Sequence, residues 1–292
     1  MKFDHLFFEG AVAVEERRAP RFEEKRARPV PAAPAPEVTE FFACLLATAA
    51  LPADAYRSRA LTRRLPACLR FLRVNTVEEA MRRLKAEPAL ATAALNVALL
   101  GVTEFFRDRA VFDALRGAVL PELLARQRAV RVWSAACSEG HELYSIAMLL
   151  AEAGRLQGSQ LLGTDCRLDA IAAARSGAFG PESLGRLDEA RRTRYFTPTR
   201  GWATIDPVLR GAVEWRVADL LHSAERGPWD LILWRNMAIY LESDAAEEIW
   251  LRLCGELAGG GYLVTGKADH LPKWLPLERV APCIYRKAEG RR

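Results

Sequence analysis

The sequence predicts an α/β fold in which a doubly wound, mostly parallel sheet follows an all-helical domain. Two observations predict it. From residue 130 onward, short apolar runs alternate with segments that carry apolar residues at helical spacing, whereas residues 37–100 carry helical spacing alone. The apolar runs also end in small or polar residues, as strands do where a ligand binds at the edge of such a sheet. The predicted strands lie near residues 130–135, 160–165, 213–217, 230–235 and 261–265.

The composition allows a large buried core. The chain has 292 residues, 50% of them hydrophobic, and a net charge of +5, which fits either attraction to an acidic partner or arginines that are simply solvated. No apolar stretch is long enough to span a bilayer. We therefore expect a cytoplasmic monomer without membrane insertion and without nucleic acid. The six cysteines are scattered without a C-x-x-C pair, so we predict neither a metal site nor disulfides.

Residues 1–36 end in a proline-rich run and are predicted to be a flexible tail and linker. Residues 37–100 are predicted to be the helical domain. Its expected helices are Phe41–Ala50, Tyr56–Arg73, Val77–Ala86 and Ala89–Leu100. The second helix is either a basic, partner-facing surface or an ordinary amphipathic helix, and Pro66 is able to kink or split it. Its arginines are Arg57, Arg59, Arg63, Arg64, Arg70 and Arg73.

After an expected helix over residues 108–126, the segment 131–150 is predicted to be a strand, a turn of small residues and a helix. Val132 and Trp133 supply the strand, and Gly140 relieves the turn. Apolar residues then recur at helical spacing, with Glu139 or Glu142 in the first turn. Such a turn is typical of a cofactor site, although it also occurs as plain packing.

Polar residues follow two further strands. Asp165 ends the second strand, and Asn236 follows the strand near 230–235. Because ligands bind at the carboxyl ends of strands in such sheets, we expect both residues beside the small-residue turn.

Four ordered motifs resemble those of the CheR-type chemoreceptor methyltransferases. TEFFRD at 103–108 is similar to the T-x-F-F-R segment of that family, ACSEGHELYS at 136–145 to its GCSTGEEPYS loop, GPWDLILWRN at 227–236 to its GPFDLI-x-CRN, and RNMAIYL at 235–241 to its RNVLIYF. The resemblance covers roughly residues 51–266. It implies a Rossmann-like class I methyltransferase sheet over residues 101–288 and S-adenosylmethionine as the cofactor. It also implies methyl transfer to a glutamate carboxylate of an acidic, helical, chemoreceptor-like protein.

The same resemblance implies that residues 177–213 form a receptor-binding insertion with a small antiparallel β-subdomain. The residues themselves are rich in glycine, proline, arginine and aromatic side chains. By itself this composition fits a helical insertion with loops equally well.

The resemblance also implies which residues bind the cofactor. Asp165 would accept hydrogen bonds from the ribose hydroxyls, since a carboxylate is an acceptor. Glu142 would face the amino group of the methionine part, although the helix dipole alone also favours an acid there. Further contacts are expected from Thr103, Arg107, Ala136, Cys137, Asp219, Leu220, Asn236 and Met237.

Methyl transfer to a carboxylate needs positioning more than a base, because the nucleophile is already ionised at neutral pH. Arg107 is expected to orient that carboxylate, since a guanidinium offers a matching fork. Tyr240 is expected near the methyl group. The ordinary alternatives are a salt bridge for Arg107 and a local hydrogen bond for Tyr240.

Several positions depart from the family pattern, among them Gly101, His141, Lys267 and Asp269. They leave open a catalytically degenerate regulatory scaffold, or a methyltransferase that acts on a small-molecule carboxylate. A nicotinamide oxidoreductase is disfavoured, because the loop lacks the G-x-G-x-x-G spacing that a pyrophosphate requires.

Overall fold

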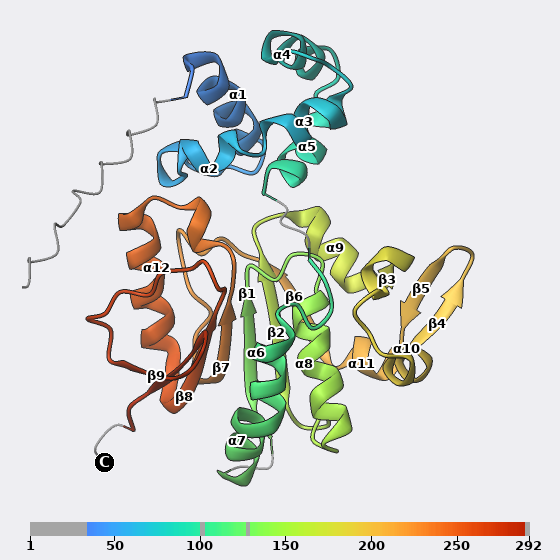
Figure 1. Ribbon diagram of the computed structural model, residues 1–292, viewed down its shortest axis with the longest axis vertical. Coiled ribbons are helices and arrows are strands. Elements are labelled where there is room, and N and C mark those ends of the chain that lie inside the picture. The colour runs from blue at the N-terminus through green and yellow to red at the C-terminus, as the bar shows by residue number, and fades with distance from the viewer. Residues whose placement is uncertain (1–33, 100–102, 127–128, 290–292) are drawn as a thin grey trace, which may run out of the picture. The chain divides into compact units, whose positions relative to one another are not determined.

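A seven-stranded sheet forms the centre of the structure, a computed structural model that describes residues 34–99, 103–126 and 129–289 (Figure 1). Its strands are β1 (Arg131–Ala135), β2 (Gln160–Asp165), β6 (Val213–Val217), β7 (Trp229–Trp234), β8 (Leu257–Thr265), β9 (Leu277–Ala281) and β10 (Ile284–Lys287). Their order across the sheet is β6-β2-β1-β7-β8-β10-β9. The strands from β6 to β8 in this order are parallel, whereas β10 is antiparallel to both β8 and β9. The predicted α/β class is therefore confirmed.

The strand order reverses at β1, which has β2 on one side and β7 on the other. In an open parallel sheet, the loops that leave two strands at such a point diverge to opposite faces and leave a crevice. The carboxyl ends of β1, β2 and β7 therefore meet where a ligand is expected.

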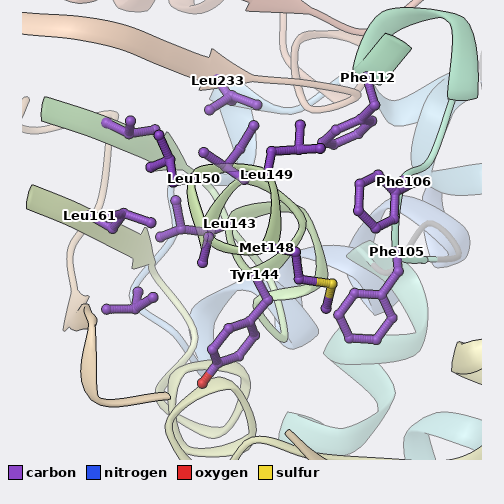
Figure 2. Packing of buried hydrophobic residues seen from close by; sticks show 14 of the residues in the cluster. Phe105, Phe106, Phe112, Leu143, Tyr144, Met148, Leu149, Leu150, Leu161 and Leu233 are labelled. Atoms are coloured by element: carbon purple, nitrogen blue, oxygen red, sulfur yellow. The ribbon is translucent and has the colours of Figure 1, made fainter. Parts of the chain in front are cut away.

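One face of the sheet is covered by α8 (His141–Glu152). Figure 2 shows its apolar side chains together with Leu161 of β2 and Leu233 of β7, all members of one buried cluster. Phe105 and Phe106, which come shortly before the helical run that begins at Arg109, belong to the same cluster and are almost fully buried. The run predicted over residues 108–126 is helical and comprises α6 (Arg109–Ala114), a π-helical turn η2 (Leu115–Val119) and α7 (Leu120–Arg126).

The opposite face carries a second core. Successive residues of β7 point to opposite faces of the sheet, and Trp234 lies on the face away from Leu233. There it packs on Trp250 of α12 (Ser243–Glu256), with ring centroids 4.1 Å apart. Buried residues of the amino-terminal helices, such as Phe41, belong to the same cluster. The helical region and the sheet therefore share a continuous core.

The amino-terminal helices in the described residues are α1 (Pro36–Ala47), α2 (Ser58–Thr62), α3 (Leu65–Leu72), α4 (Val77–Ala86) and α5 (Ala89–Leu99), with a short 3-10 turn η1 (Ala53–Ala55). A capping box begins α4, because Thr76 and Glu79 each accept the other's backbone N–H. The helix predicted over residues 56–73 is not continuous, and the split that Pro66 allowed is present. The helix is interrupted between α2 and α3. Pro66 lies in the first turn of α3, where its missing N–H would have no helical partner anyway.

The segment 177–213 contains a second, three-stranded antiparallel sheet. Its strands are β3 (Ala178–Phe179), β4 (Phe196–Thr199) and β5 (Trp202–Ile205), with β5 in the middle. The neighbouring helices are α9 (Leu168–Ser176), η3 (Pro181–Leu184), α10 (Glu189–Tyr195) and α11 (Pro207–Gly211). The structure thus has the small β-subdomain, with helices beside it, and not a purely helical insertion.

Two sequence predictions fall outside the described residues, namely the tail up to residue 33 and the departure at Gly101. Within the described ranges, no helix combines the length and the apolar character needed to cross a membrane.

Candidate functional site

Two adjoining cavities lie at the carboxyl edge of the sheet. We name the first the loop cavity, because the loop 136–138 lines it, and the second the Trp234 cavity. Their linings share Ala136, Asp165, Cys166 and Met237. Every residue predicted to contact a cofactor lines at least one of them. The loop cavity includes Thr103, Arg107, Ala136, Cys137, Glu142, Asp165, Asn236 and Met237, and the Trp234 cavity includes Asp219 and Leu220.

The loop after β1 is tightly bent and tied to β2. Ala136 and Ser138 have φ values of 57° and 51°, and Gly140, with φ 87°, precedes α8. A Cβ atom at Gly140 would lie 2.6 Å from the ring of Trp215, so a larger residue would have to move that ring. The N–H of Cys137 donates to the carbonyl of Thr164 at 2.8 Å. The predicted turn of small residues is therefore present, and it lies directly against the end of β2.

Arg235, which follows β7, joins two acidic residues of the site. Its Nη1 lies 3.0 Å from Oε2 of Glu142, and its Nη2 lies 2.7 Å from Oδ2 of Asp108 and donates to the carbonyl of Arg107 at 3.1 Å. Its side chain is only 3% exposed. Lys267 pairs with the other oxygen of Asp108 at 2.7 Å. Burial alone would raise the pKa of Asp108, but Lys267 and Arg235 hold it below its ordinary value.

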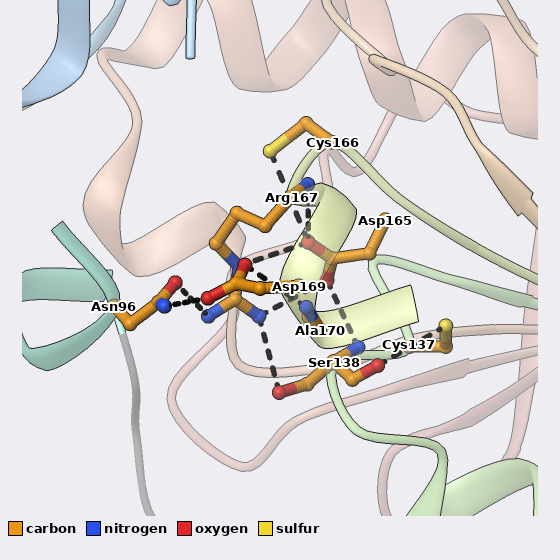
Figure 3. A network of polar contacts seen from close by, with 8 residues as sticks. All are labelled: Asn96, Cys137, Ser138, Asp165, Cys166, Arg167, Asp169 and Ala170. Carbon is orange, nitrogen blue, oxygen red and sulfur yellow. Dashed lines mark hydrogen bonds and ion pairs between the residues drawn. The ribbon is translucent and has the colours of Figure 1, made fainter. Parts of the chain in front are cut away.

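The two acids predicted to hold the cofactor differ in their hydrogen bonding. Glu142 accepts from the hydroxyl of Ser134 at 2.8 Å and from Arg235. A carboxylate has about four acceptor positions, so Glu142 can still accept a ligand amino group. Asp165 is paired instead with the buried Arg167 at 2.9 Å, at the centre of the network in Figure 3.

Arg107 is well placed to bind an anion. It lines the loop cavity, and within the described ranges no ion pair engages its guanidinium. The residues beside it are anchored, because the N–H of Phe106 donates to the hydroxyl of Ser145 at 3.0 Å and Asp108 is held by Arg235. The segment is therefore fixed while the guanidinium is left for a ligand.

Asp269 and Lys267, two of the departures from the family pattern, stabilise the site. Oδ2 of Asp269 accepts the N–H groups of Asn236 at 2.6 Å and of Gly266 at 2.7 Å. It thereby joins the ends of β7 and β8, while burial raises the pKa of its carboxyl group. Together with the Lys267–Asp108 ion pair, these contacts show that Asp269 and Lys267 connect the segments around the loop cavity.

His141 has a different environment. It is 1% exposed, and its ring lies 4.8 Å from that of Phe105 and 4.7 Å from that of Phe179, measured between centroids. Neither ring nitrogen has a hydrogen-bond partner in the described part of the chain. Burial lowers its pKa to about 4, so the ring is neutral at physiological pH. His141 is thus part of an aromatic core and lines neither cavity.

The Trp234 cavity is mainly apolar and receives one wall from the helical region. Tyr56, from the segment before α2, lines it together with Trp234, Leu241 and Ile249. Tyr56 forms an isolated β-bridge with Leu241. A mainly apolar cavity whose lining includes the carboxylates of Asp165 and Asp219 suits a flat aromatic base attached to a polar group.

Tyr240 lies elsewhere. It ends the 3-10 turn η4 (Ala238–Tyr240), is 9% exposed and lines neither the loop cavity nor the Trp234 cavity. Its carbonyl accepts the N–H of Arg57 at 2.7 Å. Its role near a methyl group therefore stays a prediction.

The predicted basic surface is smaller than expected. Arg59, Arg63, Arg70 and Arg73 are exposed. Arg57 donates to the hydroxyl of Ser243 at 3.2 Å, and the guanidinium of Arg64 donates to the carbonyl of Val97 in α5 at 2.8 Å. Arg64 therefore helps to pack the helical region and does not lie on the outer face with the others.

Sequence reasoning missed three important residues of the two cavities: Tyr56, Arg167 and Arg235. Arg235 could have been found, because it directly precedes Asn236 in RNMAIYL. Arg167 follows the predicted ribose acid by two positions. Nothing in the sequence marks Tyr56, which reaches the cavity only through the packing of the helical region on the sheet.

Comparisons with known proteins identify a family for this chain. The family model described as "CheR methyltransferase, SAM binding domain" matches residues 101–283. The chain is 33% identical over 233 residues to "Chemotaxis protein methyltransferase 1" of Pseudomonas aeruginosa, covering 74% of this chain and 84% of that protein. It is 30% identical over 217 residues to "Chemotaxis protein methyltransferase" of Listeria monocytogenes, covering 74% and 83%. A solved structure of the plantazolicin methyltransferase BpumL in complex with SAH is similar over 54% of this chain and 46% of that one, at 13% identity and a TM-score of 0.32.

Proposed function

This chain belongs to the CheR methyltransferase family, as its motifs predicted, and on that premise we propose that it methylates a glutamate side-chain carboxylate of a chemoreceptor-like protein. The family's SAM-binding domain spans residues 101–283, so the chain is a methyltransferase with S-adenosylmethionine as its cofactor. The names of the relatives in Pseudomonas aeruginosa and Listeria monocytogenes support a role in chemotaxis.

The residues present fit this cofactor. The loop cavity offers Glu142, with acceptor capacity for an amino group, and Asp165 lies where the two cavities meet. The Trp234 cavity offers apolar walls for the adenine ring. When bound, the cofactor supplies a methyl group made electrophilic by a positively charged sulfur.

The observation that carries the proposed reaction is the position of Arg107. It lines the same cavity as Glu142 and Asp165, and no carboxylate in the described residues pairs with its guanidinium. A glutamate side chain is ionised at neutral pH, so it needs a cation to orient it and no base to activate it. A fork of two N–H donors matches a carboxylate well. Arg107 is therefore the residue proposed to hold the methyl acceptor.

Two surfaces are proposed to hold the rest of the acceptor protein. The exposed Arg59, Arg63 and Arg70 on and beside α2 and α3 would attract an acidic helix. The β-subdomain formed by β3, β4 and β5 is the second proposed surface.

The test uses the full chain, labelled S-adenosylmethionine and a lysate of its own cells. We expect methyl label on protein, and we expect mild base to release it as methanol, because carboxyl methyl esters hydrolyse readily. Arg107→Ala, assayed at the same concentration, should lose most of the label. Label that resists base would identify a different nucleophile, and label found only on small molecules would contradict a protein acceptor.

A further inference from the structure

The carboxylate of Asp165, predicted to bind the ribose of the cofactor, is already engaged by the chain itself. Its Oδ1 accepts the backbone N–H of Arg167 at 3.1 Å and Nε of the same residue at 2.9 Å. Its Oδ2 accepts the N–H of Ser138 at 2.9 Å and Nη2 of Arg167 at 3.3 Å. Since a carboxylate has about four acceptor positions, no well-oriented position is left for two ribose hydroxyls.

Arg167 is held in this place from several sides (Figure 3). Its side chain is 7% exposed and lines the loop cavity. Besides Asp165, its guanidinium donates to the hydroxyl of Ser138 at 3.1 Å and to the side-chain carbonyl of Asn96 at 3.3 Å. Asn96 belongs to α5 and also contacts the carboxylate of Asp169. One guanidinium thus connects the end of β2, the loop before α8 and the last helix of the amino-terminal region.

We propose that Arg167 competes with the cofactor's ribose for the carboxylate of Asp165, and that this competition sets the affinity for S-adenosylmethionine. The inference rests on the predicted ribose contact of Asp165 and does not depend on the identity of the methyl acceptor. For the ribose to bind, Nε and Nη2 of Arg167 have to leave the two carboxylate oxygens, while the N–H groups of Ser138 and Arg167 can stay.

The displaced guanidinium has other acids to turn to. Asp169 and Glu139 both lie close enough to Arg167 to interact with its charge. Asp169 follows two residues later in α9, and Glu139 follows Ser138 in the loop. A buried cation without a partner is strongly unfavourable, so an exchange between neighbouring carboxylates is the path that keeps Arg167 paired.

Competition and simple support predict opposite results for a variant without the guanidinium. If Arg167 only holds Asp165 in position, its removal should weaken cofactor binding. If Arg167 competes, its removal leaves a buried carboxylate short of donors, which the ribose hydroxyls then supply. The variant protein should therefore be less stable alone and should bind the cofactor more tightly.

The experiment measures binding of S-adenosylhomocysteine to the full chain by calorimetry, and thermal unfolding with and without that compound. For Arg167→Met we expect a lower Tm of the protein alone, a Kd tightened by about tenfold and a larger Tm increase on binding. Arg175→Met is the matched control, because Arg175 lies on the same helix α9 and donates to the carbonyl of Trp215 instead of to an acid. The control should leave the Kd within about twofold of the original. A weaker or unchanged Kd for Arg167→Met would overturn the proposal.

Two further measurements cover a variant that fails to fold. Arg167→Lys keeps the charge but cannot span both oxygens of Asp165, so we expect a Kd between those of the original chain and Arg167→Met. A crystal structure of the original chain with S-adenosylhomocysteine should show the guanidinium away from Asp165 and beside Asp169 or Glu139. A ribose bound to Asp165 with Arg167 still in place would also overturn the proposal. Failure of the original chain to bind the compound would instead contradict the cofactor site itself.

Discussion

Two nearly buried arginines line the loop cavity, and they leave different numbers of acceptor positions on their acidic partners. Arg235 pairs with Asp108 and Glu142, and Glu142 keeps acceptor positions for a ligand. Arg167 pairs with Asp165 and, together with backbone N–H groups, occupies the acceptor positions of that carboxylate. A buried cation can therefore either fix an acid for a ligand or compete with the ligand for it. The number of acceptor positions left on the acid decides which of the two occurs.

The largest loss of stability is expected when Arg235, the cation that holds its acids in place for a ligand, is removed. Arg235→Met leaves two acids of a mostly buried cluster without their shared partner. Because Lys267 still pairs with Asp108, we expect a loss near the lower end of the usual range, about 3 kcal/mol in the free energy of unfolding. Denaturant unfolding measures it. Arg216→Met is the control, since Arg216 pairs with Glu214 and Glu225 on the surface and should cost about 1 kcal/mol or less. Equal losses in the two variants would remove the distinction between buried and surface pairs.

A second test concerns Arg107, the cation that neither holds an acid for the cofactor nor competes with the cofactor for one. Arg107→Ala should reduce kcat by about 100-fold, because the acceptor carboxylate loses its orientation, while the Kd for S-adenosylhomocysteine stays within about threefold. Arg107→Lys should recover little of the loss, since a point charge does not reproduce the fork. Single-turnover kinetics and calorimetry separate the two effects. A comparable loss of cofactor affinity would place Arg107 with the fixing cations.

His141 extends the comparison to a buried group that is stable only when uncharged. Its pKa in the folded chain is about 4, below the ordinary value near 6.5. As the pH falls from about 6.5 to about 4, the unfolded chain binds a proton that the folded chain does not, so stability falls by up to about 1.4 kcal/mol per pH unit. His141→Phe should abolish this component, because phenylalanine fits among Phe105 and Phe179. The measurement is the difference between the two unfolding free energies across this pH range, and a constant difference would contradict the prediction.

The smallest effect is expected at the exposed arginines. Charge reversal of Arg63 and Arg70 should raise KM for the acceptor protein by about fivefold with little change in kcat, because surface charges act mainly on encounter. The effect should shrink with added salt, as screening acts over about 8 Å at physiological ionic strength. Arg82→Glu, on the exposed side of α4, is the control. A KM indifferent to salt and to the double reversal would mean that these helices are only structural.

Sequence patterns predicted β1, β2, β7 and β8 well because these strands are apolar and mostly buried. They did not predict β9 and β10, and β9 is largely exposed. The same patterns did not locate the interruption between α2 and α3, because the apolar spacing of Leu61, Leu65, Leu69 and Leu72 continues across it. Pro66 is the local signal for this interruption, whereas the contact of Arg64 with a carbonyl of α5 has no local signal. The β-subdomain could not be decided because strands such as Ala178–Phe179 are too short to show alternation.

Residues of the cavity lining were predictable where they lie in a motif close to the end of a strand, as Glu142, Asp165 and Asn236 do. Their partners were not, since the pairing of Glu142 with Arg235, for example, joins residues 93 positions apart. The state of Asp165 could not be predicted for the same reason. It depends on how the guanidinium of Arg167 is held by Ser138 and Asn96, which only the folded chain brings together.

Tyr56 lines the Trp234 cavity, and this affects where the chain can be cut into separate portions. Leu99, at the end of α5, likewise lines the loop cavity. The portion matched by the family model begins at residue 101, so both residues lie outside it. Separating that portion from the amino-terminal helices would therefore remove a lining residue from each of the two cavities. Exchange of catalytic portions between relatives should accordingly succeed only when the helices before them are carried along.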